Sequence, residues 1–335
     1  EMGFKNLTLA ASSLSAVHAP LIEHIRSGLI THIETSGLRG ELAEQISRGL
    51  MDFPVVFRSH GGRASAIRSG ELHIDVAFLG APSCDPYGNA NGYSRDDDDG
   101  ISCGSLGYAR TDAEFADKVI IITNNIVSYP NAPWAIPEHD VDYVVRVDDI
   151  GDPKGIMSGA TRYTKDPKEL LIAKTAANVV EAAGYLYDGF SMQMGSGGAS
   201  LATARFIRQK MLDKGIRCRF ALGGITGQIT AMHEEGLIDR ILDVQSFDLD
   251  AAKSLKNNHF HHQISATYYA SHLVATAAEQ LDFVILSALE IDTDFNVNVL
   301  TGSDGVIRGA IGGHPDTAES ASLAVIVAPL VRGRI

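Results

Sequence analysis

Two glycine-rich segments have the residue types and spacing that suit the binding of an anion. Gly195-Ser196-Gly197-Gly198 joins an apolar run to a helix-like stretch, and Ala221–Gly227, which contains Gly223 and Gly224, repeats this arrangement. Backbone N–H groups in such a turn, together with the N-terminus of the following helix, can approach a negatively charged atom. The spacing matches neither a P-loop nor a complete GxGxxG, and a simple tight turn is an equal alternative. Two glycine-rich strand ends on one edge of a parallel sheet nevertheless favour a binding site there.

Cations and imidazoles also lie in glycine-rich turns. Arg58-Ser-His60-Gly-Gly-Arg63 brings two guanidinium groups close to one imidazole, and Arg308 precedes Gly312-Gly313-His314 in a second such cluster. Because arginine pairs bidentately with carboxylates, these clusters suit a carboxylate-rich substrate, with ordinary surface turns as the alternative. Asn298 either pins a turn or lines the same cleft.

The histidines and cysteines form no convincing metal or redox motif. His259, His261 and His262 lie close together, but without the carboxylate or cysteine spacing of a metal site, so no metal is expected. The three cysteines contain no CxxC pair, which argues against a disulfide framework and favours a reducing cytoplasm.

The composition limits the class of partner. The chain has 335 residues with 45% hydrophobic residues, enough for two packed domains. Its net charge of −13 argues against general nucleic-acid binding, which needs a basic face. Its apolar runs are far shorter than the roughly 18 residues of a membrane span, and no secretory signal opens it.

The sequence contains an internal repeat, so the strands and helices that must position these residues are expected to occur twice. Asp75-Val-Ala-Phe-Leu79 and Asp282-Phe-Val-Ile-Leu286 lie 207 positions apart, and flanking blocks match at similar offsets. The same offset of 207 relates three further pairs: Asp85 and Asp292, Asn89 and Asn296, and Asn91 and Asn298. We therefore predict two tandem copies of one α/β unit, residues 1–165 (copy one) and 166–335 (copy two).

Strand-like and helix-like segments alternate within each copy, which predicts mostly parallel sheets flanked by helices. The expected strands include Leu7–Ala11, Val55–Phe57, Val76–Leu79, Val119–Thr123 and Tyr143–Val147. The expected helices are Ala19–Arg26, Leu38–Gly49, Lys168–Ala183, Ala199–Asp213 and Gly227–Gly236. The opening strand and glycine loop of copy two have no counterpart in copy one, and Ile335 maps near Val127 of copy one, which has further strands beyond it; we therefore expect a chain clipped at both ends.

Longer motifs along essentially the whole chain resemble the family of citrate lyase alpha subunits. They are FSMQMGSGGASLATARF, FALGGITG, ILDVQSFDLDAAKSL, LSALEIDTDFNVNVLTGSDGVIRGAIGGHPDTA and VAPLVRGRI in copy two, and SHGGR and CGSLGYA in copy one. The resemblance implies the two-domain α/β fold of coenzyme A transferases.

The resemblance also implies a reaction and partners. Citrate would replace the acetyl group on an acyl-carrier thiol, which gives citryl-carrier and acetate, and a separate beta subunit (citryl lyase) would then cleave the citryl-carrier. The implied partners are the acyl carrier protein (gamma) subunit and that beta subunit, in an oligomeric complex. No tightly bound cofactor is implied; the substrate is acetyl-CoA or the phosphoribosyl-dephospho-CoA arm of the carrier.

The resemblance suggests roles for the clustered residues. Ordinary two-domain coenzyme A transferases carry a nucleophilic glutamate on the strand end after their glycine loop, where this chain has Gly223-Gly224. A direct attack of citrate on the thioester in a ternary complex is the alternative, with catalysis by proximity and oxyanion stabilisation. The expected catalytic groups are Gly197, Gly198, Gly224 and His314; the substrate-binding groups His60, Arg63, Arg308 and Asn298; and the thioester-arm contacts Gly195, Ser196, Gly223, Gly312 and Gly313.

Two other functions stay open. Glu290 follows an apolar strand and could be the covalent nucleophile of a coenzyme A transferase or acyl-CoA hydrolase. The chain could also be a non-catalytic scaffold for other lyase subunits. Nothing in the sequence separates citrate from citramalate.

Overall fold

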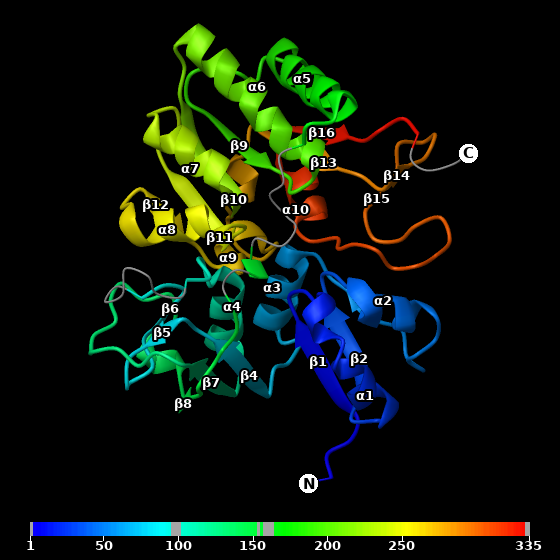
Figure 1. The fold of residues 1–335 in the computed structure, drawn as a ribbon, viewed down its shortest axis with the longest axis vertical. Helices are drawn as coiled ribbons and strands as arrows, with labels where there is room; N and C mark the ends of the chain where they lie inside the picture. The colour runs from blue at the N-terminus through cyan, green and yellow to red at the C-terminus, as the bar shows by residue number, and fades with distance from the viewer. Residues whose placement is uncertain (1–2, 95–101, 153–154, 157–163, 332–335) are drawn as a thin grey trace.

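The computed structural model describes residues 3–94, 102–152, 155–156 and 164–331, which form two α/β domains (Figure 1). The helices are α1 (Leu21–Arg26), α2 (Gly40–Ser47), α3 (His60–Ser69), α4 (Gly107–Phe115), α5 (Pro167–Ala182), α6 (Gly198–Lys214), α7 (Gly227–Glu234), α8 (Leu249–Asn257), α9 (Ala266–Ala270) and α10 (His314–Ser320). The strands of copy one are β1 (Leu7–Ala11), β2 (Ile30–Thr35), β3 (Val56–Phe57), β4 (Val76–Gly80), β5 (Ser83–Cys84), β6 (Ala90–Asn91), β7 (Lys118–Thr123) and β8 (Tyr143–Arg146). Those of copy two are β9 (Phe190–Met194), β10 (Cys218–Ile225), β11 (Ile241–Ser246), β12 (His261–Gln263), β13 (Phe283–Ser287), β14 (Glu290–Ile291), β15 (Val297–Asn298) and β16 (Leu323–Val327).

Copy two is built on one parallel sheet of six strands in the order β12-β11-β10-β9-β13-β16. Every residue of the central strand β9 is buried, as expected for a parallel strand covered on both faces. Phe190, Met192 and Met194 point into a core shared with α5, α6 and α7. The opposite face packs against α9 and, through Ala64, against α3 of copy one.

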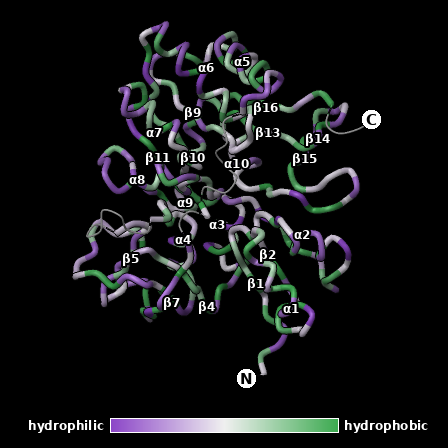
Figure 2. The backbone as a smooth tube through the Cα atoms, in the orientation of Figure 1, coloured by the Kyte–Doolittle hydropathy of each residue, from purple (hydrophilic) through white to green (hydrophobic). Residues whose placement is uncertain are grey.

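Copy one contains two parallel sheets, β1-β2-β3 and β4-β7-β8, so the predicted fold class of two related, mostly parallel domains is confirmed. In Figure 2, hydrophobic residues mark β1 and β2 beside α1 and α2, where their side chains form one core. The predicted boundary at 165/166 stays a prediction; α5 begins just after it, at Pro167. Among the described residues, no helix combines the length and apolar character that crossing a membrane requires.

The hairpins β5–β6 and β14–β15 show how closely the copies match. Ser83 pairs with Asn91 in one hairpin, and Glu290 pairs with Asn298 at the equivalent place in the other. In both turns the asparagine Nδ2 donates to the preceding aspartate at 2.8 Å, in the pairs Asn89–Asp85 and Asn296–Asp292. The spacing in the sequence therefore reports a repeated structure.

The copies differ where β9 lies. In copy two, β9 pairs with both β10 and β13 and joins them in one sheet. In copy one, β1 corresponds to β10 and β4 to β13, but these two strands belong to separate sheets. Phe78 of β4 is 67% exposed, while its counterpart Ile285 is fully buried in the core under α5 and α6. Within the described residues, copy one has no equivalent of the α5–β9–α6 unit that covers this face.

Segments of each copy form hydrogen bonds with the other copy. Residues 299–312, which we call the copy-two arm, reach copy one, where Leu38 N donates to Gly309 O (3.2 Å) and Gly312 N to Ser36 O (3.3 Å). In the opposite direction, the Ser105 hydroxyl donates to the Asp243 carbonyl at 2.8 Å. The first two contacts join the β2–α2 turn of copy one to the segment that leads into α10 of copy two.

Candidate functional site

The glycine loop predicted from the sequence lies at the carboxyl edge of the copy-two sheet. Gly195 follows β9 and donates to the Ile285 carbonyl of β13 at 2.7 Å, while Gly197 is the N-cap of α6. The hydroxyls of Ser200 and Ser287 lie 2.6 Å apart and join the first turn of α6 to the end of β13. An added Cβ at Gly197 would lie only 2.2 Å from Ser287 Oγ, so this close approach requires glycine.

Gly223 and Gly224 lie beside this loop, near the end of the neighbouring strand β10. Gly223 has a φ of +100°, and an added Cβ there would lie 2.5 Å from the side-chain amide carbon of Gln193. An added Cβ at Gly224 would lie 2.0 Å from the ring of Phe247. The space beside this strand end is therefore filled by an amide and an aromatic ring from elsewhere in copy two.

The third predicted cluster, Gly312-Gly313-His314, opens α10 at the same edge. His314 faces the backbone of Ser287, the residue that touches the glycine loop. His60 of copy one lies against Gly312, with its Nε2 3.5 Å from the position of an added Cβ. His60 Nδ1 also contacts the Ser36 hydroxyl at 3.1 Å. The structure thus brings all three glycine clusters and both histidines to one region between the copies.

Both imidazoles in this region are neutral at physiological pH. Burial lowers the pKa of His60 to about 3, assisted by the nearby charge of Arg63. Burial also lowers the pKa of His314, and the positive charge of Arg39 adds to the effect. These rings can donate or accept a hydrogen bond but do not supply a fixed positive charge.

The two arginines predicted to bind citrate carboxylates already have partners. Arg63 is buried in α3, where its terminal nitrogens donate to both carboxylate oxygens of Asp112 at 2.9 and 2.6 Å. Its guanidinium joins α3 to α4, so a role of Arg63 in binding citrate stays a prediction that this pairing does not favour. Arg308 is exposed on the copy-two arm and pairs with Asp304, and its contact with citrate stays a prediction.

Asn298 and the segment before Arg63 have structural roles that the sequence left open. Asn298 Nδ2 donates to the carboxylate of Glu290 at 3.0 Å and to the Thr301 carbonyl at 2.9 Å, which pins the hairpin turn. The expected turn after Arg58 is instead the start of α3, where the Ser59 hydroxyl accepts from Gly62 N at 2.9 Å. Ser59 at the N-cap was the available signal for this helix.

Two charged residues near the site were missed in the sequence. Arg39 ends the β2–α2 turn, is exposed, and has no carboxylate partner among the described residues. Glu169, in the first turn of α5, places a carboxylate oxygen 2.7 Å from the position of an added Cβ at Gly198. Arg39 lies between Gly37 and Gly40, so a glycine-rich turn was the available signal for it, whereas only the tertiary structure relates Glu169 to the site.

The remaining candidates are Glu290, Cys103 and the histidines at 259, 261 and 262; Glu290 follows the last residue of β13 by three positions. Glu290 is exposed on β14. Burial raises the pKa of Cys103 to about 12, which keeps it a thiol. His261 is buried between Asp243 (3.1 Å) and Ser254 (3.0 Å) rather than grouped with His259 and His262. Within the described ranges, the side chains that come close enough to hold a metal ion are His73, Asp75 and Asp117, all exposed.

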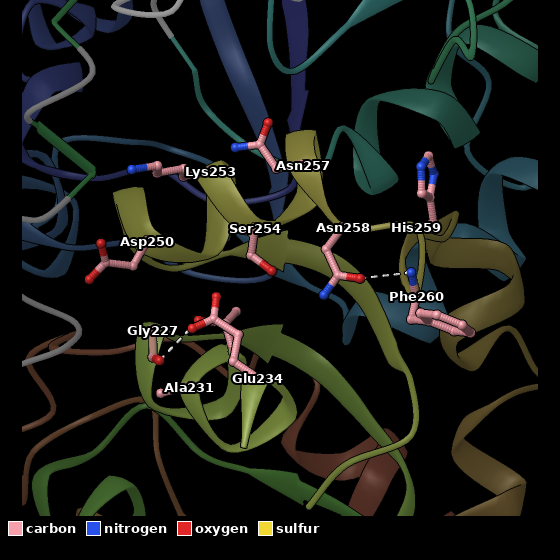
Figure 3. Close-up of a pocket in the computed structure, with 11 residues that line it drawn as sticks. Gly227, Ala231, Glu234, Asp250, Lys253, Ser254, Asn257, Asn258, His259 and Phe260 are labelled. Carbon is pink, nitrogen blue, oxygen red and sulfur yellow. Dashed lines mark hydrogen bonds between the residues drawn. The ribbon is translucent and has the colours of Figure 1, made fainter. Parts of the chain in front are cut away.

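A groove of about 660 Å³ lies between α7 and α8 and is lined by Lys253, Asn257 and Glu234 (Figure 3). His259 and Phe260, which precede β12, close one end of it. None of the residues predicted to be catalytic lines this groove. Gly227, the last residue of the glycine-rich segment Ala221–Gly227, does line it, so the groove adjoins that segment without including Gly223 or Gly224.

Comparison with known proteins agrees with this architecture. An acyl-CoA transferase of Escherichia coli O157:H7 superimposes with a TM-score of 0.59 at 14% identity, over 99% of this chain and 79% of that one. The fold is therefore that of the coenzyme A transferases. The model of the family described as "Citrate lyase, alpha subunit (CitF)" matches residues 1–335, and the chain belongs to this family.

Individual members of the family are closely similar to it. The citrate lyase alpha chain of Haemophilus influenzae is 61% identical over 336 residues, and that of Escherichia coli K12 is 59% identical. These alignments cover 100% of this chain and 66% and 65% of the two relatives, so the chain spans about two thirds of their length. A crystal structure from Streptococcus mutans, described as a putative citrate lyase alpha subunit in complex with citrate, has a TM-score of 0.95 at 56% identity, over 100% of this chain and 65% of that one.

Proposed function

We propose that this chain carries the transferase site of a citrate lyase, where citrate replaces acetate on the thiol of an acyl carrier. The single observation that carries the proposal is the convergence of three glycine clusters on one sheet edge, in a chain 56% identical to a protein crystallised with citrate. The N–H groups of Gly197 and Gly198, at the N-terminus of α6, have no acceptor in the described part of the chain. Such N–H groups are suited to an oxyanion.

The proposed reaction proceeds in two balanced steps within a ternary complex. A carboxylate oxygen of citrate attacks the acetyl thioester carbonyl, the C–S bond breaks, and the carrier leaves as a thiolate beside a mixed anhydride. The thiolate then attacks the citryl carbonyl of the anhydride, the C–O bond breaks, and acetate leaves. Both tetrahedral intermediates carry an oxyanion, so the same N–H groups serve both steps. Holding the reactants together contributes up to about 7–11 kcal/mol.

The crowding at Gly223 and Gly224 supports a mechanism without an enzyme-bound acyl group. A nucleophilic side chain at either position would overlap with Gln193 or Phe247. The alternative nucleophile, Glu290, is exposed and accepts a hydrogen bond from Asn298 in its own hairpin. Citrate's own carboxylate is therefore the proposed first nucleophile.

Arg39 is our proposed ligand for a spare carboxylate of citrate. It lies at the turn where copy one contacts the copy-two arm, and it lacks an internal counter-ion among the described residues. The neutral rings of His60 and His314 would add hydrogen bonds rather than charge. We therefore propose Arg39, rather than Arg63 or Arg308, as the arginine that binds a carboxylate of citrate.

The partners follow from the same proposal. We propose an acyl carrier (gamma) subunit that presents its phosphoribosyl-dephospho-CoA arm to the glycine clusters, and a citryl lyase (beta) subunit that consumes the product in the cytoplasm. Acetyl-CoA is the free substitute for the carrier.

A thioester-exchange assay tests the proposal directly. The full-length protein is given acetyl-CoA with citrate, citramalate, tricarballylate or succinate, and the acyl-CoA products are identified by mass spectrometry. Formation of citryl-CoA and acetate supports the proposal, and preference for another acid would change the substrate. Absence of exchange with every acid, by a protein that still binds citrate, would favour the scaffold alternative.

A further inference from the structure

Gln193 and Tyr269 form a buried pair that joins two of the glycine clusters. Gln193 lies near the end of β9, and its side-chain Nε2 donates to the Tyr269 hydroxyl at 3.0 Å. The amide of Gln193 lies over the backbone of Gly223, where an added Cβ would be 2.5 Å away. The Tyr269 oxygen lies against Gly313, at 2.5 Å from an added Cβ. The two side chains therefore span the distance from β10 to the N-cap of α10.

The pair is enclosed and uncharged. Gln193 is 8% exposed and Tyr269 is 2% exposed. Burial raises the pKa of Tyr269 well above its usual range, so its hydroxyl keeps its proton. Such a pair can hold two backbone segments apart without placing a second negative charge beside an anionic substrate.

Tyr269 is itself held by the contact between the copies. It lies on α9, whose N-cap Ser265 accepts from Tyr268 N at 3.1 Å. Helix α9 crosses α3 so closely that an added Cβ at Gly61 would be 1.9 Å from the Ala270 carbonyl oxygen. The position of the hydroxyl is therefore fixed by backbone packing rather than by a flexible surface helix.

We propose that the Gln193–Tyr269 pair is the positioning element of the acyl-transfer site, setting the separation between the Gly223–Gly224 backbone and Gly312–Gly313. The inference rests on the proposed function, because it assigns these two backbones to opposite sides of the reacting thioester. Glycines have no side chains with which to fix their own spacing, so a neighbouring pair must fix it. Gln193 occupies the volume into which a side chain at Gly223 would project.

The test compares Gln193→Met and Tyr269→Phe, which keep the volume and remove the hydrogen bond, in the full-length protein. Tyr268→Phe is the matched control, because it removes a hydroxyl from the adjacent, 42% exposed residue. A misplacement of about 1 Å costs on the order of 100-fold in rate, so each variant should lower kcat about 10- to 100-fold. The KM for citrate should stay within about twofold. Because either substitution breaks the same Gln193–Tyr269 contact, the double variant should be no slower than the slower single variant.

The outcomes separate the inference from the proposed function. If the wild type itself shows no citrate-dependent exchange, the proposed function fails. If the wild type is active and both variants keep its kcat, the pair is only core packing and the inference is wrong. Thermal unfolding identifies a variant that fails to fold. If Gln193→Met unfolds, Tyr269→Phe still decides: a lower kcat with unchanged KM supports the inference, and an unchanged kcat overturns it.

Discussion

The hydroxyl of Ser59 donates a 2.5 Å hydrogen bond to the carboxylate of Asp316 across 257 positions of sequence. The second carboxylate oxygen of Asp316 accepts from Gly61 N at 2.9 Å. One buried side chain near the start of α10 thus binds the first turn of α3 in the other copy. This contact holds His60 and His314 on their two sides of the same site.

Removing this contact should loosen the junction between the copies. Asp316→Ala leaves buried donors unpaired, which costs about 1–3 kcal/mol in the free energy of unfolding. In a double-mutant cycle with Ser59→Ala, the two losses should sum to more than the loss of the double variant, with a coupling of about 1 kcal/mol. Denaturant titration measures both quantities. Strict additivity would mean that the hydrogen bond contributes nothing to the junction.

Arg39→Ala should weaken citrate binding. Loss of a charge-assisted hydrogen bond costs about 1.5–3 kcal/mol, which corresponds to roughly 10- to 100-fold in the citrate KM. The KM for acetyl-CoA should not change, since the thioester lacks the spare carboxylates that Arg39 would bind. Arg308→Ala is the matched control, because its charge already pairs with exposed Asp304. Equal citrate KM values in the Arg39→Ala and wild-type proteins would remove Arg39 from the site.

The sequence predicted the repeated elements well because their signals are local. Leu7–Ala11 and Val76–Leu79 are short apolar runs, and they appear as β1 and β4. The repeat at offset 207 predicted two matching units, and the structure has equivalent hairpins at the repeated positions. In contrast, β2 was not among the expected strands, because Ile30–Thr35 has only two apolar residues, Ile30 and Ile33, and forms no apolar run.

The pairings within the site could not be predicted because they join distant segments. Arg63 was expected to face substrate, but Asp112 lies beside it only once α3 packs on α4. Gln193 and Phe247 lie in motifs that the sequence marks, but their relation to Gly223 and Gly224 exists only in the folded sheet. Glycines reveal that backbones approach closely, but they do not identify the neighbour.

Gly197→Ala should impair both packing and catalysis. Its Cβ would lie 2.2 Å from Ser287 Oγ and 3.0 Å from Ser287 Cβ, so the end of β13 or the first turn of α6 must shift. We expect a loss of about 1–3 kcal/mol in stability and a lower kcat. Adding Ser287→Ala removes the nearer atom and should restore part of both. Gly198→Ala is a useful comparison, because its Cβ meets the flexible end of Glu169 and should cost less. Equal effects at positions 197 and 198 would contradict this account.

Acid should destabilise the protein partly through His60. Burial holds the folded-state pKa of His60 near 3, below the value of about 6.5 for an unfolded chain. Between these values the unfolded state binds a proton that the folded state does not, so the stability from His60 is lost as the pH falls from about 6.5 toward 3. Comparing pH 7.5 with pH 5, the wild type should lose about 1–2 kcal/mol more than His60→Gln. Denaturation curves at the two pH values measure this difference, and parallel losses would show that His60 is not buried as a neutral ring.

No covalent acyl-enzyme should form on this chain. Transferases that use a glutamate form an enzyme-bound thioester from acyl-CoA alone, because their own carboxylate is the first acceptor. Here Gly223 and Gly224 carry no side chain, and the adjacent volume is filled by Gln193 and Phe247. Incubation of the full-length protein with acetyl-CoA, without citrate, should therefore give no protein-bound CoA by intact-mass measurement. Borohydride, which reduces a glutamyl thioester, should leave the activity unchanged.

Glu290→Ala distinguishes this mechanism from the alternative. Glu290 is exposed and hydrogen-bonded by Asn298, so its removal should affect only the hairpin and leave citrate-dependent exchange within about threefold of wild type. Asn298→Ala is the matched control, since it breaks the same hydrogen bond while keeping the carboxylate. If Glu290→Ala abolishes exchange and Asn298→Ala does not, the carboxylate itself takes part in the chemistry. A CoA adduct on the Glu290 peptide would complete that case and replace the ternary complex with a covalent transferase mechanism.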